Sequence, residues 1–110
     1  MRSIIRNHKD FAMPEEAPVF KTEYFIARAR PTIWPGDAKY GITATKRTLK
    51  LAVDRNRAKR VLRVWIRDNE KSMSPKLDYV FIVRAGILKA DFQAGKELMK
   101  TAMKKLILNS

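Results

Sequence analysis

The sequence predicts a mixed α+β fold in a single domain. Three observations support this prediction: strand-like segments precede residue 47, a helical apolar period follows them, and a short, almost wholly apolar run separates that helix from a second one. A helix that joins two strands of one sheet requires a crossover, so helices and sheet form packed layers. The 110 residues suit one domain, residues 1–110, and 45% apolar residues are enough for a core.

The N-terminal segment, residues 1–18, is predicted to be short or irregular in structure. Pro14 and Pro18 interrupt it, so any helix between His8 and Met13 has to be short. The segment begins with basic residues but lacks a sustained apolar stretch, so it does not have the pattern of a secretory signal.

Strands and a turn are predicted next. Residues 19–30, VFKTEYFIARAR, are rich in aromatic and β-branched residues, which is typical of a strand. Proline and glycine in residues 31–37, PTIWPGD, predict a turn. Residues 39–46, KYGITATK, place Tyr40 and Ile42 on one face and so predict a further strand.

The period then changes to that of an amphipathic helix in residues 54–69, DRNRAKRVLRVWIRDN. Apolar residues follow the i, i+3, i+4, i+7, i+8 spacing of a buried stripe: Ala58, Val61, Leu62, Trp65 and Ile66. Asp54 precedes the stripe and is predicted to be the N-cap, where a carboxylate also suits the helix dipole.

A strand and a second helix complete the prediction. Residues 78–85, DYVFIVRA, are nearly all apolar, as in a strand covered on both faces. Asp91 is predicted to cap the last helix. Its apolar side contains Phe92, Leu98, Met99, Ala102, Met103 and Leu106, and its opposite side contains Lys96, Lys100 and Lys104.

The first helix is also the most basic part of the chain. At 100° per residue, the face opposite the apolar stripe contains Asn56, Arg60, Arg63 and Arg67, and this row is flanked by Lys59 and Arg57. Basic residues four positions apart repel one another, and the first turn of a helix disfavours cations. A ligand that carries phosphate groups would relieve both effects. The alternative is a solvated face, and Asn56 itself either contacts a base or only favours the helix start.

The whole chain has the same charge bias. Lys and Arg number 24 against 11 Asp and Glu, for a formal charge of +13, which favours a polyanionic partner. Nucleic acid is the first candidate, an anionic membrane surface the second and an acidic protein the third. There is no cysteine, so disulfides and thiolate metal sites are excluded. Because no apolar run approaches the roughly 20 residues needed to span a bilayer, a cytoplasmic protein is expected.

No catalytic or metal-binding residue is predicted on the chain. His8 is the only histidine, and the carboxylates are scattered apart from the adjacent Glu15 and Glu16. No serine lies in a nucleophile motif, and the four glycines do not form a phosphate-binding loop. The chain is therefore expected to bind a nucleic acid rather than to carry out chemistry itself.

Three motifs together resemble those of a known family. RNRAKRVLR, residues 55–63, is similar to the RNR signature helix of the bacterial ribonuclease P protein subunit. GITATKR, residues 41–47, resembles the strand and basic turn before that signature, and DYVFIVRAG, residues 78–86, resembles the strand after it. The resemblance covers roughly residues 11–107. It implies a single-domain α/β sandwich in αβββαβα order, similar to the second domain of ribosomal protein S5, with the signature helix in a left-handed βαβ crossover.

The resemblance also implies a function. The family's protein binds a catalytic RNA and the 5′ leader of precursor tRNA, and it assists magnesium-dependent endonucleolytic removal of the leader. The active site and its Mg²⁺ belong to the RNA, and the protein is expected as a monomer in a 1:1 complex. The rival interpretation is a non-enzymatic RNA-binding or ribosome-associated module. A helix-turn-helix DNA-binding protein is a weaker alternative, because a strand separates the two predicted helices.

The family's functional residues map onto positions that match its motifs. Contacts to RNA are expected from Arg55, Asn56, Arg57, Lys59, Arg60, Arg63, Arg67, Lys46 and Arg47. The leader cleft is expected to include Phe11, Phe25, Ile26, Asn56, Lys59 and Arg63. Phe25 and Ile26 could instead be core residues, and for Phe25 the core is the favoured interpretation. The helical wheel suggests that the flank with Asn56, Lys59 and Arg63 faces the leader, and that Arg57 and Arg60 face the catalytic RNA.

The chain also departs from the family pattern at three places. Glu15 stands where a second aromatic residue usually follows Phe11, which predicts a truncated N-terminal helix. The family's Gly-Asn pair before the signature is missing from TLKLAVD, residues 48–54, so that loop is expected to differ. Arg28 stands near a position that is aromatic in the family. The leader cleft is therefore expected to be altered.

Overall fold

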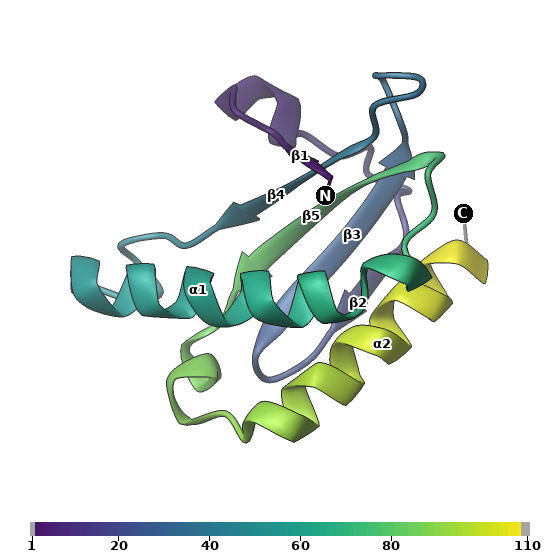
Figure 1. Cartoon of the computed structure of the whole chain (residues 1–110). Coiled ribbons are helices and arrows are strands. Elements are labelled where there is room, and N and C mark those ends of the chain that lie inside the picture. Colours follow the sequence, from purple (N-terminus) through teal and green to yellow (C-terminus); the bar gives the residue numbers. More distant parts are fainter. Residues whose placement is uncertain (1, 109–110) are drawn as a thin grey trace.

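A single five-stranded sheet is covered on one face by two long helices. A computed structural model gives this architecture and describes residues 2–108 (Figure 1). The strands are β1 (Ser3–Ile4), β2 (Val19–Lys21), β3 (Phe25–Pro31), β4 (Lys39–Thr43) and β5 (Leu77–Val83). The helices are α1 (Ala52–Asp68) and α2 (Phe92–Leu108), with short 3₁₀ turns at η1 (His8–Phe11), η2 (Glu70–Ser72) and η3 (Ala85–Lys89). No helix within residues 2–108 is long and apolar enough to cross a bilayer.

The strand order is β1-β4-β5-β3-β2, so the last strand in the chain lies at the centre of the sheet. β4 pairs in parallel with both β1 and β5, whereas β3 is antiparallel to both β5 and β2. α1 connects β4 to β5 across the face that is turned toward the viewer in Figure 1. Seen from that side with both strands pointing upward, β5 lies to the left of β4, so the crossover is left-handed, against the usual preference.

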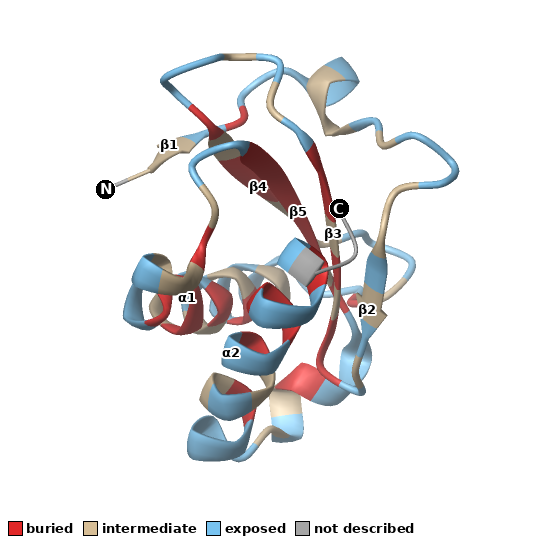
Figure 2. Ribbon diagram, turned by 90° about the vertical axis from the view of Figure 1, so that its right-hand side faces the viewer, coloured by how far each residue is buried: buried red, intermediate tan, exposed pale blue. Residues whose placement is uncertain are grey.

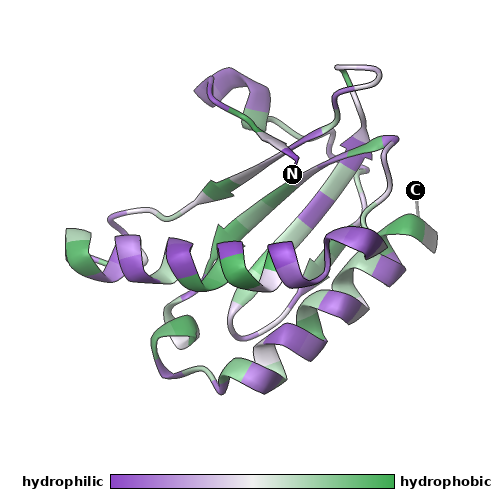
Figure 3. Ribbon diagram, in the orientation of Figure 1, coloured by the Kyte–Doolittle hydropathy of each residue, from purple (hydrophilic) through white to green (hydrophobic). Residues whose placement is uncertain are grey.

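Trp65 lies at the centre of the core. Its side chain is fully buried, and its ring contacts those of Tyr24 and Phe25 with centroids 5.9 and 6.3 Å apart. A Cβ atom added to Gly95 of α2 would come within 2.1 Å of the indole. Glycine at this position therefore allows the two helices to approach closely. The orientation of α1 can be followed in Figures 2 and 3. Its buried and hydrophobic side faces the sheet, and its hydrophilic side faces outward.

The structure confirms the predicted apolar stripe of the first helix. Four of its five residues are buried, and the fifth, Val61, packs partly against the core. The cap of the last helix is also confirmed, because the backbone N–H of Ala94 donates to Asp91 Oδ1 over 2.9 Å. Phe92 is 48% exposed, although its ring lies 5.8 Å from that of Trp65.

The predicted N-cap of the first helix is wrong. The helix begins at Ala52, two residues before Asp54, and its N-cap residue is Leu51, which makes no side-chain capping hydrogen bond. Instead, Arg55 Nη1 donates to the carbonyl oxygens of Leu49 and Lys50, each over 2.8 Å. An arginine from the first turn therefore binds the loop that a capping side chain would otherwise stabilise.

The N-terminal half differs from the prediction in two ways. Residues 19–30 form a hairpin rather than one strand, because Thr22 Oγ1 accepts hydrogen bonds from the backbone N–H groups of Tyr24 and Phe25 and turns the chain. In addition, the segment before the short helix contains β1, a two-residue parallel strand that was not predicted. The predicted short helix itself is confirmed as one 3₁₀ turn, η1.

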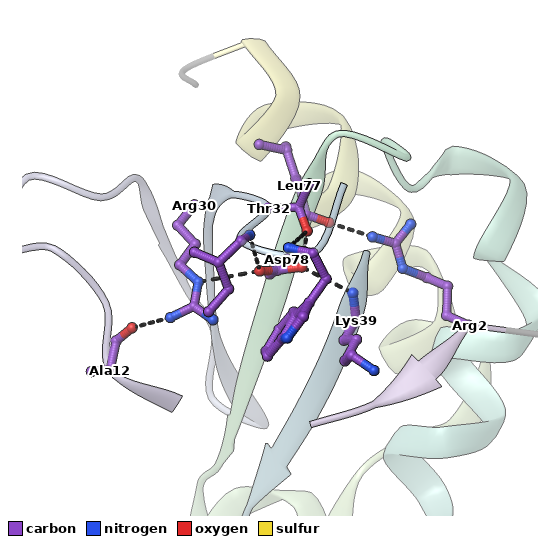
Figure 4. A network of polar contacts seen from close by, with 9 residues as sticks. Arg2, Ala12, Arg30, Thr32, Lys39, Leu77 and Asp78 are labelled. Atoms are coloured by element: carbon purple, nitrogen blue, oxygen red, sulfur yellow. Dashed lines mark hydrogen bonds and ion pairs between the residues drawn. The ribbon is translucent and has the colours of Figure 1, made fainter. Parts of the chain in front are cut away.

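A buried carboxylate joins three strands at one end of the sheet (Figure 4). Asp78 of β5 has no exposed surface and accepts four hydrogen bonds. The donors are Arg30 Nε at 3.3 Å, Thr32 Oγ1 at 2.7 Å, the N–H of Ile33 at 3.1 Å and the N–H of Lys39 at 2.9 Å. A buried charge is tolerated when it is paired and fully hydrogen-bonded in this way. The network anchors the turn between β3 and β4.

Candidate nucleic-acid interface

The outward face of α1 presents a row of unpaired polar side chains, four of which are arginines. Its exposed members are Asn56, Arg57, Arg60, Arg63 and Arg67. Within residues 2–108, none of these side chains makes a hydrogen bond or an ion pair. The row is therefore available to an external ligand along the whole length of the helix.

The acidic residues of α1 do not neutralise this row. Asp68 lies toward α2, where its Oδ2 is 3.8 Å from Lys96 Nζ. Asp54 is half-buried and has no ion-pair partner within the described part of the chain. Four guanidinium groups therefore remain uncompensated on one helix face, and repulsion between them favours a bound polyanion.

The two flanks of α1 face different parts of the molecule. Burial raises the pKa of the Tyr40 phenol on β4, and the positive charge of nearby Arg63 is the strongest influence that opposes this rise. The Arg63 flank, which at 100° per residue also contains Asn56 and Lys59, is therefore turned toward β4. Arg57 lies on the opposite flank, which at 100° per residue it shares with Asp68, the residue paired with Lys96 of α2. The assignment of one flank to the leader and the other to the catalytic RNA stays a prediction.

Three further predicted RNA-binding residues lie around the start of α1. Lys46 and Arg47 are exposed in a turn that the Thr45 and Thr48 hydroxyls close with a hydrogen bond of 3.1 Å. Arg55 is half-buried, and its guanidinium is engaged by loop carbonyls. The structure thus leaves Lys46 and Arg47 accessible to a ligand and gives Arg55 a structural role.

The residues predicted for a leader cleft do not meet in one site. Phe25 is fully buried between Trp65 and Phe81 on the helix-covered face of the sheet, so its assignment to a cleft is wrong. Its neighbour Ile26 points to the opposite, open face and is half-buried.

Phe11 also lies on this open face. A Cβ atom added to Gly41 would come within 2.4 Å of the Phe11 ring, so glycine allows the ring to lie directly on β4. The cleft residues Phe11 and Ile26 are therefore separated by the sheet from Asn56, Lys59 and Arg63, which project from α1 on the other side.

Two arginines of β3 shape the open face, and sequence reasoning missed their role. Arg28 Nη2 donates to the carbonyl oxygens of Pro14, Glu15 and Ala17 at 3.1, 3.2 and 3.0 Å. Arg30 donates in the same way to the carbonyl oxygen of Ala12. Residues 12–17 are thereby held beside the open face by backbone contacts. The only signal in the sequence was the alternation of the two arginines along a predicted strand.

The described residues do not fit a dedicated magnesium site. Within residues 2–108, no three His, Cys, Asp or Glu side chains form a group that could hold a metal ion. The most enclosed carboxylate, Asp78, already accepts hydrogen bonds from four donors of the chain.

Comparison with known proteins identifies consistent relatives. Residues 2–107 match the family model described as Ribonuclease P. The Ribonuclease P protein component of Edwardsiella ictaluri is 33% identical over 100 residues, which cover 91% of this chain and 82% of that protein. The corresponding component of Idiomarina loihiensis is 35% identical over 71 residues, or 64% of this chain, and that alignment spans only 56% of the relative.

Solved structures give the same result. The RNase P protein from Thermotoga maritima has a TM-score of 0.76 and 25% identity to this chain, with 94% of this chain and 97% of that one covered. The Staphylococcus aureus RNase P protein has a TM-score of 0.71 at 16% identity, with 98% and 94% covered, and it supports the fold alone.

Proposed function

Because this chain belongs to the ribonuclease P protein family, we propose that it is the protein subunit of a ribonucleoprotein endonuclease that removes the 5′ leader of precursor tRNA. The observation that supports this function most directly is the row of unpaired guanidinium groups on α1. The proposed partner is one catalytic RNA molecule per protein monomer, and the proposed compartment is the cytoplasm.

The α1 row binds the phosphate backbone of the catalytic RNA in this proposal. A guanidinium group presents a planar set of donors that matches phosphate oxygens, and each phosphate that is neutralised releases condensed counterions. Because the apolar stripe of α1 is packed on the sheet around Trp65, the row keeps a defined spacing. The protein therefore contributes a rigid, positively charged helix face, which holds two RNA segments at fixed positions relative to each other.

The leader contacts the protein from the β4 side. The flank with Lys59 and Arg63 faces this strand, and Phe11 lies on the opposite face of the same strand. Magnesium ions would be held by the RNA and not by residues of this protein, and they would supply metal-activated water and charge stabilisation at the phosphate that is cleaved. The protein's own residues bind and orient the substrate and reduce the repulsion between the two RNAs.

Reconstitution tests this function. Purified protein is added to a bacterial ribonuclease P RNA and a precursor tRNA with a leader, and cleavage is followed as the magnesium concentration is lowered. The protein is expected to lower the magnesium requirement and to improve turnover. If cleavage with and without the protein has the same magnesium dependence and the same turnover, the proposed function is wrong.

A matched pair of variants separates specific contacts from net charge. Arg57→Ala with Arg60→Ala and Lys100→Ala with Lys104→Ala each remove two exposed positive charges, from α1 and from α2 respectively. Only the α1 pair is expected to abolish the effect of the protein. Sequencing the RNA that copurifies from the native cell tests the rival interpretation, since ribosomal RNA would indicate a ribosome-associated module.

A further inference from the structure

We propose that a pocket beside Trp34, on the open face of the sheet, binds one unpaired RNA nucleotide with its base stacked on the indole. The pocket has a volume of about 200 Å³. It is lined by Ile4, Arg6, Asn7, Asp10, Trp34 and Lys39. None of these residues belongs to α1, so the site is distinct from the basic row of that helix.

The turn that carries Trp34 is well anchored. The N–H of Trp34 donates to Thr32 Oγ1 over 3.0 Å, and the same hydroxyl donates to the buried Asp78 over 2.7 Å. On the other side of the turn, the N–H of Asp37 donates to the carbonyl oxygen of Trp34 over 2.8 Å. Gly36, with φ at +81°, adopts the left-handed conformation that this turn requires. The half-buried indole is thus held at the wall of the pocket.

Two cations lie over the Trp34 ring, and they differ in burial, since the side chain of Arg30 is 8% exposed and that of Lys39 is 22% exposed. Arg30 Cζ is 5.6 Å from the ring centroid, and this arginine is buried and paired with Asp78. Lys39 Nζ is 5.2 Å from the centroid, and its ion-pair partner Asp37 is 58% exposed. A base that enters the pocket can therefore displace the lysine ammonium from the ring. The displaced ammonium remains close enough to pair with the phosphate of the same nucleotide.

The remaining wall supplies polar groups suited to a nucleotide. Arg6 and Asn7 are exposed, Asp10 is half-buried, and within residues 2–108 none of these side chains makes a hydrogen bond or an ion pair. Side chains such as Asn7 and Asp10 recognise the hydrogen-bonding edge of an unpaired base, and a guanidinium such as Arg6 binds phosphate. An aromatic platform, a free amide and the two basic side chains of Arg6 and Lys39 match the requirements of single-stranded RNA.

The position of Phe11 favours a nucleotide within a strand over an isolated one. Lys39 and Gly41 are two residues apart on β4 and so lie on the same face, about 7 Å apart. The Phe11 ring covers Gly41, and Lys39 borders the pocket. Phe11, which also stacks with His8 at a centroid distance of 6.4 Å, therefore borders the same face of β4 as the pocket beside Trp34, as on surfaces where successive bases stack. Only the identification of this RNA as the precursor leader depends on the proposed function.

Tryptophan fluorescence gives a direct test, because the chain contains only Trp34 and Trp65 and the latter is fully buried. The probe is a single-stranded RNA of about six nucleotides, added to the full-length protein without catalytic RNA. Binding is expected to quench the Trp34 emission. Trp34→Ala is expected to bind the same RNA roughly 5- to 150-fold more weakly, the range expected for one lost stacking contact.

Further variants keep the result unambiguous. Trp34→Phe retains an aromatic ring and is expected to recover most of the affinity, whereas Ile33→Ala, at an exposed neighbouring position, is expected to leave it unchanged. Melting curves of each variant verify folding. The proposal is wrong if the RNA does not bind, if it binds without a change in Trp34 emission, or if folded Trp34→Ala binds with parental affinity. Arg60→Ala is expected to weaken binding to the catalytic RNA but to preserve quenching by the short RNA, so the two proposals can fail separately.

Discussion

Neighbouring arginines of the signature helix have different surroundings, which sequence similarity does not distinguish. Arg55 donates two hydrogen bonds to backbone carbonyls of the chain itself, whereas Arg57 and Arg60 are exposed and unpaired within the described residues. All three match the family signature. The structure therefore divides them into one residue that stabilises the protein and two that are free to bind RNA.

Single substitutions at these positions are expected to have different effects. Arg57→Ala and Arg60→Ala should each weaken binding to the catalytic RNA and lower the slope of log K against log salt by about one, because each removes one phosphate contact. Arg55→Ala should mainly lower the free energy of unfolding, by about 1 kcal/mol, because two loop carbonyls lose their donor. Filter binding at several salt concentrations and urea denaturation measure the two quantities. A parental slope in Arg57→Ala and Arg60→Ala would show that these residues touch no phosphate.

Trp65 is the residue on which the buried face depends most. Trp65→Ala is expected to lower the free energy of unfolding by roughly 3–5 kcal/mol, because it leaves a cavity between α1, α2 and the sheet. Gly95→Ala should also destabilise the protein, by about 1–3 kcal/mol, since the added methyl group would collide with the indole. Calorimetry or chemical denaturation measures both changes. Parental melting of Trp65→Ala would contradict the described packing.

The helix α1 lacks the N-terminal side-chain cap that most helices have. Leu51 occupies the N-cap position, makes no side-chain hydrogen bond and is 61% exposed. Leu51→Asn is therefore expected to increase the free energy of unfolding by about 1 kcal/mol, because the amide oxygen can accept a bond from a free N–H of the first turn. Thermal melting measures this gain, with Leu51→Ala as the control for the loss of an exposed apolar group. A Leu51→Asn variant no more stable than Leu51→Ala would contradict this need for a capping acceptor, which Arg55 cannot meet because its guanidinium only donates hydrogen bonds.

The elements that were predicted correctly are those with a local signal. The stripe around Trp65 has the helical period, and the apolar run of β5 has the composition of a covered strand. β1 has only two residues and exists because Ser3 and Ile4 pair with Lys39 and Tyr40, more than thirty positions away. The same reason explains the N-cap error, since the position of the helix start depends on where the loop from β4 brings the chain.

The functional site was likewise predicted only where it depends on a local sequence pattern. The basic row of α1 could be predicted, because it depends on the period of one helix. The expected leader cleft combined residues from three elements, and the alternation of side chains along β3 places Phe25 in the core and Ile26 on the open face. The pocket beside Trp34 could not be predicted, because only the fold brings a turn at residues 32–38 next to residues 4–10.

The net charge of +13 opposes the compact state of the free protein. Raising sodium chloride from about 0.05 to about 0.3 M is expected to raise the melting temperature by a few degrees, because screening reduces repulsion along α1. The same change should weaken the complex with RNA. Chloride is preferred to sulfate, which stabilises proteins by exclusion from their surface as well. A melting temperature that does not rise with salt would show that the charges of α1 are too dispersed to strain the fold.

The central position of β5 has a consequence for how the protein is made on the ribosome. Before residues 77–83 leave the exit tunnel, the strands already synthesised can form only a β2–β3 hairpin and a separate β1–β4 pair, and isolated two-stranded units are marginally stable. α1 therefore emerges before the surface on which it docks is complete. During translation the nascent polypeptide therefore carries its arginine row on an unfinished chain until synthesis has passed β5.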